Sequence, residues 1–252
     1  MKIIDTHTHY SDGISVIGGP PVSAGRMVEI MDENNVECCW CSSMTALNRD
    51  YREANERQWL ETKEYPGRFM NYVVVNGNYP EQVEDEIRRC VEDRGFGGLK
   101  FHNWCSGFPI DSKGTHRAME LAIEYDIPVL FHDGTPPWAE TLQVAAMAEY
   151  YPEARVMIGH AGLFDAWQSA IQACNTHDNI WLGICGPCVG DAAEIIKSVR
   201  PDRILFGSDF AVNDKPYLLA ERINVLKLAC PDEALQQQIF YDNAVEILKK
   251  SR

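Results

Sequence analysis

Short apolar runs alternate with amphipathic stretches along the whole chain. Eight of the runs predict strands: KIIDTHT (2–8), ECCWCSS (37–43), FMNYVVVN (69–76), GGLKFHN (97–103), IPVLFHD (127–133), RVMIGHA (155–161), NIWLGIC (179–185) and RILFGSD (203–209). Several of them are almost continuous in Val, Ile, Leu and Phe, which is typical of parallel strands that are buried on both faces. The pattern therefore predicts a parallel sheet of eight strands.

Between these runs, apolar residues recur at the spacing of one helix face. Such stripes occupy residues 24–31, 83–91, 118–125 and 192–199. Two further helical stretches, 216–229 and 232–250, follow the last predicted strand. We expect the first to be the eighth helix of the repeat and the second to be an extra C-terminal helix that closes the outside of the fold.

Eight βα units in 252 residues match the size of a (β/α)8 barrel. A doubly wound sheet is the alternative, but HTHYSDG after the first strand contains no glycine-rich phosphate loop. No linker or change in composition interrupts the chain. We therefore predict an α/β protein whose single domain, residues 1–252, is a TIM barrel with an extra C-terminal helix.

Charge limits the classes of partner. The net charge is −14, with 37 acidic and 23 basic residues and no basic stripe, which disfavours nucleic acid and anionic membranes. No stretch approaches the roughly 18 apolar residues of a membrane span, and the N-terminus has no signal-peptide pattern, so we expect a cytoplasmic protein. A small-molecule substrate, including an anionic one, stays open because a lysine or a metal ion can reverse the sign of a pocket. A homo-oligomer also stays open.

The nine cysteines follow no disulfide pattern and are typical of small buried side chains in a reducing compartment. One pair, Cys185-Gly-Pro-Cys188, has the spacing of a thioredoxin-like redox motif between an expected strand and helix. However, it lies far along an α/β repeat, whereas redox domains of that type carry the motif near their first strands. We favour a loop-and-core cysteine pair over a redox pair.

Barrel active sites lie at the C-terminal ends of the strands, and here these ends carry chemically active side chains. They are His7 and His9 on the first strand, Lys100 and His102 on the fourth, His132 on the fifth, His160 on the sixth and Asp209 on the eighth. Each has an ordinary structural explanation, such as a helix cap for Asp209 or an ion pair for Lys100. What favours a functional site is that each of these strands ends at the same mouth of the barrel.

His7 and His9 are two residues apart on one strand, so their side chains share a face about 7 Å apart and can converge on one ion. Imidazole and carboxylate groups are zinc ligands, and catalytic zinc sites keep one position open for water. Together with His132 and Asp209, the two histidines predict a metal site of four ligands.

The motifs DTHTH, GLKFH, PVLFHDGTP, VMIGHAG and ILFGSDF resemble the amidohydrolase superfamily. They are most similar to its amidohydrolase-related branch, which includes TIM-barrel hydrolases and enzymes like aminocarboxymuconate-semialdehyde decarboxylase. The likeness extends from residue 3 to about residue 210, and FYDNAVEIL resembles the closing helix of that branch.

The resemblance implies that His7, His9, His132 and Asp209 hold one divalent ion, with zinc expected. It implies that His160 is a catalytic histidine that polarises the metal-bound water or a substrate carbonyl. Asp209 would accept a proton from that water and pass it to the leaving group.

Lys100 leaves the number of metal ions open. Members of the superfamily with two metals use a carboxylated lysine of the fourth strand as a bridge, which would make Lys100 a ligand of a second ion. GLKFH is more similar to the mononuclear members, in which the lysine is free to attract an anionic substrate. We favour one ion, with Lys100 in substrate binding.

Aromatic residues and a further histidine follow the strand ends and suggest a lined substrate pocket, although packing of long loops explains them equally well. They are Tyr10, His102, Trp104, Phe108 and Trp138.

The sequence thus favours a metal-dependent hydrolase that uses an activated water on a small amide, lactone or ester. The first alternative is a metal-dependent non-oxidative decarboxylase of a small unsaturated or aromatic acid on the same barrel. The chain is shorter than many decarboxylases of that branch, which favours hydrolysis slightly. The third hypothesis is a non-catalytic metal-binding or redox protein.

Overall fold

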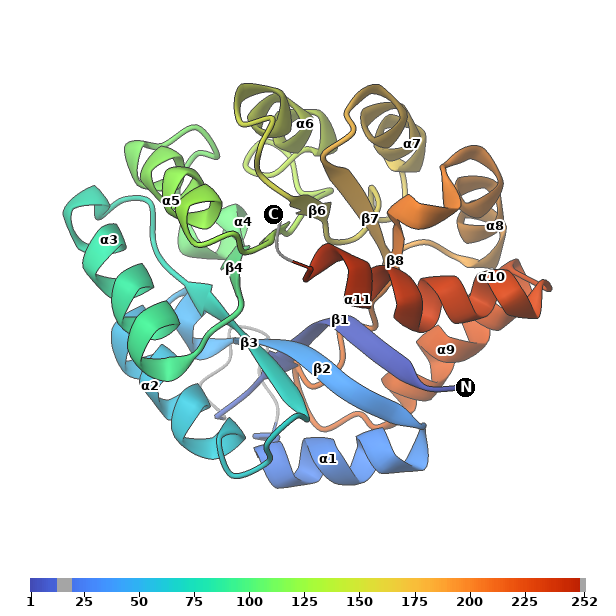
Figure 1. Ribbon diagram of the computed structural model, residues 1–252, viewed down its shortest axis with the longest axis horizontal. Coiled ribbons are helices and arrows are strands. Elements are labelled where there is room, and N and C mark those ends of the chain that lie inside the picture. Colours follow the sequence, from blue (N-terminus) through green and yellow to red (C-terminus); the bar gives the residue numbers. More distant parts are fainter. Residues whose placement is uncertain (13–19, 250–252) are drawn as a thin grey trace.

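The computed structural model of the protein describes residues 1–12 and 20–249. Its strands are all parallel and hydrogen-bonded in chain order (Figure 1): β1 Ile3–Tyr10, β2 Val36–Ser43, β3 Phe69–Val74, β4 Gly98–Phe101, β5 Val129–Phe131, β6 Val156–Ile158, β7 Ile180–Ile184 and β8 Ile204–Phe206. β8 and β1 meet where the His9 amide donates to the Phe210 carbonyl at 2.9 Å and Thr8 forms a bridge to Phe210. The eight strands thus form a nearly closed barrel, which confirms the predicted fold.

Helices alternate with the strands and surround the barrel (Figure 1). Their bounds are α1 Ala24–Glu33, α2 Tyr51–Thr62, α3 Pro80–Arg88, α4 Asn103–Ser106, α5 Lys113–Glu124, α6 Thr141–Tyr150, α7 Trp167–Thr176, α8 Val189–Ser198, α9 Tyr217–Ala229, α10 Glu233–Gln237 and α11 Asn243–Ile247. In the part of the chain that the structure describes, no helix is long and apolar enough to cross a membrane.

Strand alternation produces two apolar layers. Val129 and Phe131 of β5 pack in the large cluster between strands and helices, whereas Leu130 between them belongs to a smaller cluster with Met157 and Leu205. This alternation follows from successive side chains of a strand pointing to opposite faces. The smaller cluster is the filling of the barrel interior.

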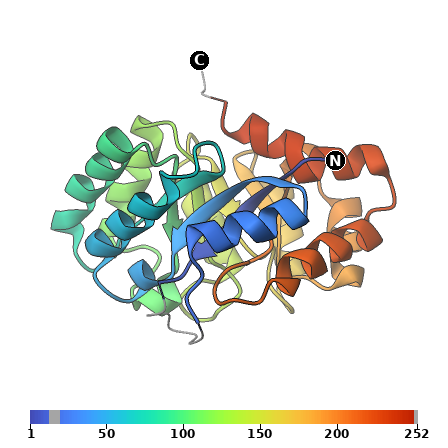
Figure 2. The same cartoon turned by 90° about the horizontal axis from the view of Figure 1, so that it is seen from below.

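The C-terminal segment lies elsewhere than the sequence suggested. The predicted helix 232–250 is α10, a π-helical turn over Gln238–Asp242 and α11. Ala244 and Ile247 of α11 pack against the interior cluster, and the segment lies at the same end of the molecule as the N-terminus (Figure 2). The last helix therefore covers the N-terminal end of the barrel instead of its outside, because this end exposes apolar interior side chains that need a cover.

A register shift in β1 turns its histidines into the barrel. Ile4 already belongs to the interior cluster, so regular alternation would direct His7 and His9 outward. The pairing with β2 changes register between Asp5 and Thr8. Such bulges reverse the facing of the residues that follow and recur next to active sites.

Candidate active site

Side chains from β1, β4 and the end of β8 meet at the C-terminal end of the barrel. His9 Nε2 lies 2.9 Å from Asp209 Oδ1, and His7 Nε2 lies 3.7 Å from the same oxygen. The Nζ atom of Lys100, which is fully buried, lies 2.8 Å from His7 Nε2. The structure therefore brings together four of the residues that the sequence singled out.

The histidines of β5 and β6 form the adjoining part of the site. His160 Nε2 and His132 Nδ1 share a hydrogen bond of 2.8 Å. His102 stacks on His132 with ring centroids 3.7 Å apart, and the rings of His7 and His160 are 4.7 Å apart. All of the histidines predicted at strand ends thus lie in one cluster.

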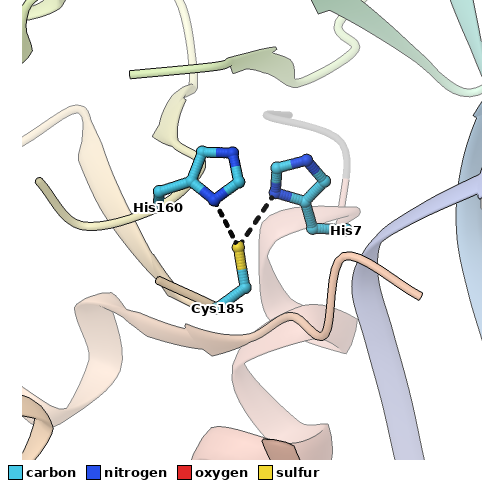
Figure 3. A group of neighbouring side chains, drawn as sticks. All are labelled: His7, His160 and Cys185. Atoms are coloured by element: carbon cyan, nitrogen blue, oxygen red, sulfur yellow. Dashed lines mark hydrogen bonds between the residues drawn. The ribbon is translucent and has the colours of Figure 1, made fainter. Parts of the chain in front are cut away.

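Cys185 also contacts this cluster, which the sequence analysis did not predict. Its sulfur is 2.9 Å from His160 Nδ1 and 3.4 Å from His7 Nδ1 (Figure 3). It also donates to the Gly159 carbonyl at 3.0 Å. The thiol therefore contacts the Nδ1 atoms of both rings, whereas it is Nε2 of His7 that lies near Asp209.

The two cysteines of the CGPC motif are in different environments. Cys185 is buried among the histidines, whereas Cys188 is exposed, precedes α8 and donates to Asp191. Cys185 therefore contacts the histidine cluster and Cys188 does not share this environment, which the spacing of the motif alone could not reveal.

Two glycines make room for His7. A β-carbon on Gly159 would lie 2.9 Å from His7 Cε1, and one on Gly207 would lie 2.9 Å from His7 Cβ. Separations this short require the histidine to move, so the IGH and FGS sequences are needed for the position of the ring. Asp209 itself has φ +58°, a strained conformation that aspartate tolerates better than most residues.

Two buried carboxylates, which the sequence analysis missed, anchor the loops of the site. Asp5 accepts hydrogen bonds from the amides of His7 at 3.2 Å and Ser208 at 3.1 Å, so it ties β1 to the end of β8. Asp133 accepts from the amides of His160 at 2.6 Å and Gly162 at 2.7 Å. Both lie next to the predicted strand ends, but only the folded geometry shows that they serve backbone amides.

We expect Asp133→Asn to destabilise the fold by about 1–3 kcal/mol, because an amide offers one acceptor oxygen where the carboxylate serves two N–H groups. Urea unfolding of the variant and of the control Asp111→Asn, an exposed position, measures the difference. An unfolding free energy equal to that of the unaltered protein would show that these hydrogen bonds do not stabilise the loop.

Electrostatics keep the ring nitrogens available as ligands. Burial, reinforced by the Lys100 charge, lowers the pKa of His7 well below its usual value, and burial lowers that of His160 to about 4. Burial would raise the pKa of Asp209, but the hydrogen bond with His9 holds it well below its usual range. At neutral pH the rings of His7 and His160 are thus uncharged, and the carboxylate of Asp209 is ionised.

These residues fit a divalent metal ion. One ligand atom each from His7, His9 and Asp209 lie within 4.8 Å of one another, and nitrogen and carboxylate oxygen are donors that zinc and manganese accept. His132 Nε2 is buried without a hydrogen-bond partner, but His132 is not among the three residues whose ligand atoms gather in this group. The ligand atoms of a second group, which consists of His7, His160 and Cys185, also lie within 4.8 Å of one another. In this group the sulfur of Cys185 contacts Nδ1 of His7.

The residues predicted to bind substrate do not all lie at the mouth. Trp104 and Trp138 are exposed, His102 stacks on His132, and Lys100 lies inside the cluster. Tyr10, in contrast, is buried in the outer apolar cluster, and burial and Glu61 of α2 raise its pKa. It is one residue beyond His9 and therefore points to the opposite face of β1.

Comparison with known proteins fits this geometry. The sequence matches the amidohydrolase family over residues 44–250, which is most of the chain. The chain belongs to the amidohydrolase family. The match begins after β1, so the placement of His7 and His9 in this amidohydrolase rests on the geometry.

Solved structures share the fold of this amidohydrolase. The 2,6-dihydroxybenzoate decarboxylase from Rhizobium has a TM-score of 0.74 at 17% identity, with 98% of each chain covered. A dihydroxybenzoic acid decarboxylase from Polaromonas sp. JS666, with bound manganese and the inhibitor 2-nitroresorcinol, has a TM-score of 0.75 at 19% identity, covering 98% of this chain and 96% of that one.

A probable 2-pyrone-4,6-dicarboxylic acid hydrolase from Acinetobacter baumannii, with citric acid bound, has a TM-score of 0.74 at 17% identity, covering 98% of this chain and 99% of that one. A search of curated proteins finds no significant match. Structural similarity at identities this low establishes only the fold, so the reaction has to be inferred from the residues of the site.

Proposed function

We propose that this amidohydrolase is a metal-dependent decarboxylase of a small unsaturated or aromatic acid. The observation that carries the proposal is the meeting of His7, His9 and Asp209 with the buried amine of Lys100. The decarboxylases among the solved structures support the choice of reaction. Since the Rhizobium enzyme is covered over 98% of its chain, chain length gives no reason to prefer hydrolysis.

In this proposal His7, His9, His132 and Asp209 hold the metal ion, with zinc or manganese as candidates. When bound, the ion supplies positive charge that stabilises negative charge developing on the substrate. Burial lowers the pKa of Lys100 to about 8, so the side chain is mostly an ammonium at neutral pH and attracts an acid. In this proposal the charges of the ion and of Lys100 draw the acid toward Asp209.

The carboxylate of Asp209 is ionised and first accepts a proton, for example from a hydroxyl group of the substrate. The bond between the substrate carbon and its carboxylate then breaks, CO2 leaves, and the electron pair stays on the carbon. Asp209 then returns its proton to that carbon, and the oxygen that gave up the proton regains one from water. The acid is thereby converted into CO2 and the protonated product, with no oxidant or reductant required.

Hydrolysis of an amide, lactone or ester is the second candidate. The solved hydrolase supports it, and so does the ionised Asp209, which can accept a proton from an attacking water.

A decisive test supplies the metal-loaded protein with hydroxybenzoates, other unsaturated acids, lactones and esters, and follows CO2 release and acid production in parallel. We expect CO2 from at least one acid, lost in Asp209→Asn. Turnover of lactones or esters without CO2 from any acid would establish hydrolysis instead.

A further inference from the structure

A cavity of about 400 Å³ opens beside the histidine cluster. His132, His160 and Asp209 line it, together with Asn213 from the segment after β8 and Arg222 from α9. This volume is in the range of small-molecule sites. The cavity therefore joins the candidate reacting centre to residues that the motifs do not include.

Three of the described residues that line this cavity each have a buried polar atom without a hydrogen-bond partner. They are His132 Nε2, Asn213 Oδ1 and Arg222 Nε. Buried polar groups are nearly always paired, because an unpaired one costs about 1–3 kcal/mol. Since His132 Nε2 is already a candidate metal donor, Asn213 and Arg222 are left to pair with a bound molecule.

Arg222 is held in place without being neutralised. Its Nη2 donates to the carbonyl of Pro187, in the CGPC segment, at 2.8 Å. Most arginines in residues 1–12 and 20–249 form salt bridges, but within these ranges no carboxylate pairs with Arg222. A guanidinium that is fixed by one hydrogen bond and keeps its other N–H groups free is arranged to receive an external anion.

The surrounding charges are mixed. Lys215 and Glu221 also line the cavity, and both are exposed, so water screens them. Asp209 also lines the cavity, and its carboxylate is engaged by His9 and belongs to the candidate metal site. Of the two side chains with a permanent positive charge that line the cavity, Lys215 and Arg222, Arg222 is thus the less exposed.

We propose that Arg222 binds a second, non-reacting carboxylate of the substrate, and that Asn213 accepts a hydrogen bond from a hydroxyl or amino group of the same molecule. The substrate class is then a small dicarboxylic acid. The choice of the non-reacting group rests on the proposed function: a carboxylate that departs as CO2 gains nothing from a strong ion pair in the ground state. Binding the other carboxylate instead orients the molecule and leaves the reacting one at Asp209.

Binding of two probes to the full-length protein tests the subsite without requiring turnover. The probes are benzene-1,3-dicarboxylate and benzoate, titrated calorimetrically against the unaltered protein, Arg222→Met and Arg222→Lys. The matched control is Arg49→Met, an exposed arginine that lines a different cavity. We expect Arg222→Met to weaken binding of the dicarboxylate by about 10- to 100-fold, with a smaller loss in Arg222→Lys and none in the control.

Benzoate has no second carboxylate, so its affinity is expected to be the same in all of these proteins. Equal weakening for both probes, no change in Arg222→Met, or no binding of the dicarboxylate to the unaltered protein would each overturn the subsite. If the expected pattern appears but no acid releases CO2, the subsite stands and the proposed decarboxylation fails. If CO2 release occurs and Arg222→Met binds the dicarboxylate as the unaltered protein does, the proposed decarboxylation stands and the subsite fails.

Discussion

Replacing Asp209 with asparagine is expected to lower kcat by about 10²–10⁴-fold, the range for loss of a positioned proton-transfer group. The carboxylate is the one oxygen donor in the group that it forms with His7 and His9, and it is ionised in the folded protein. An amide keeps nearly the same shape but cannot accept and return a proton. Steady-state kinetics on the substrate found by the CO2 and hydrolysis assays measure the effect.

The matched control is Asp214→Asn, which changes a carboxylate in the same segment after β8. Asp214 lies 3.7 Å from Arg26 on the surface and contacts none of the site histidines. Its kcat is expected to equal that of the unaltered protein. A fully active Asp209→Asn variant would remove Asp209 from the reaction under either proposed chemistry.

His132→Ala is expected to weaken metal binding by more than about 10-fold. Loss of a residue that only hydrogen-bonds a metal ligand already lowers metal affinity by about 10- to 100-fold. The variant removes the buried Nε2 atom, which makes no hydrogen bond within the fold and is the proposed fourth donor. Competition titration with a coloured chelator gives the affinity, and circular dichroism reports whether the barrel is intact. His7→Ala is expected to lose the ion as well, but it also removes contacts to Lys100 and Cys185.

His177→Ala is the control for histidine removal, because His177 lies at the end of α7, away from the cluster. It is expected to bind metal as the unaltered protein does. Unchanged affinity in a folded His132→Ala variant would exclude His132 as a ligand and leave its unpaired nitrogen to the substrate.

The strand pattern was sufficient for the barrel because parallel strands buried on both faces leave a strong apolar signal. The ends of those strands then located His7, His9, Lys100, His132 and Asp209 at one mouth. The direction of side chains was harder to predict. The register shift within β1 and the outward orientation of Tyr10 depend on pairing with β2, which no local pattern encodes.

Other parts of the site depend on contacts between distant segments. Cys185 meets His7 across 178 positions of the chain, and Asp5 meets Ser208 across 203. Arg222 lies on an amphipathic helix, where an arginine is ordinarily a solvated surface residue. Only the folded structure shows that its Nε is buried without a partner beside the cavity.

The metal content of the purified protein tests the central claim most directly. Elemental analysis of the native protein is predicted to find one divalent ion per chain. A chelator is expected to remove the ion and the activity together, and addition of zinc or manganese is expected to restore both. Two ions per chain would favour Lys100 as a bridging ligand. Full activity in protein shown to be free of metal would contradict the account.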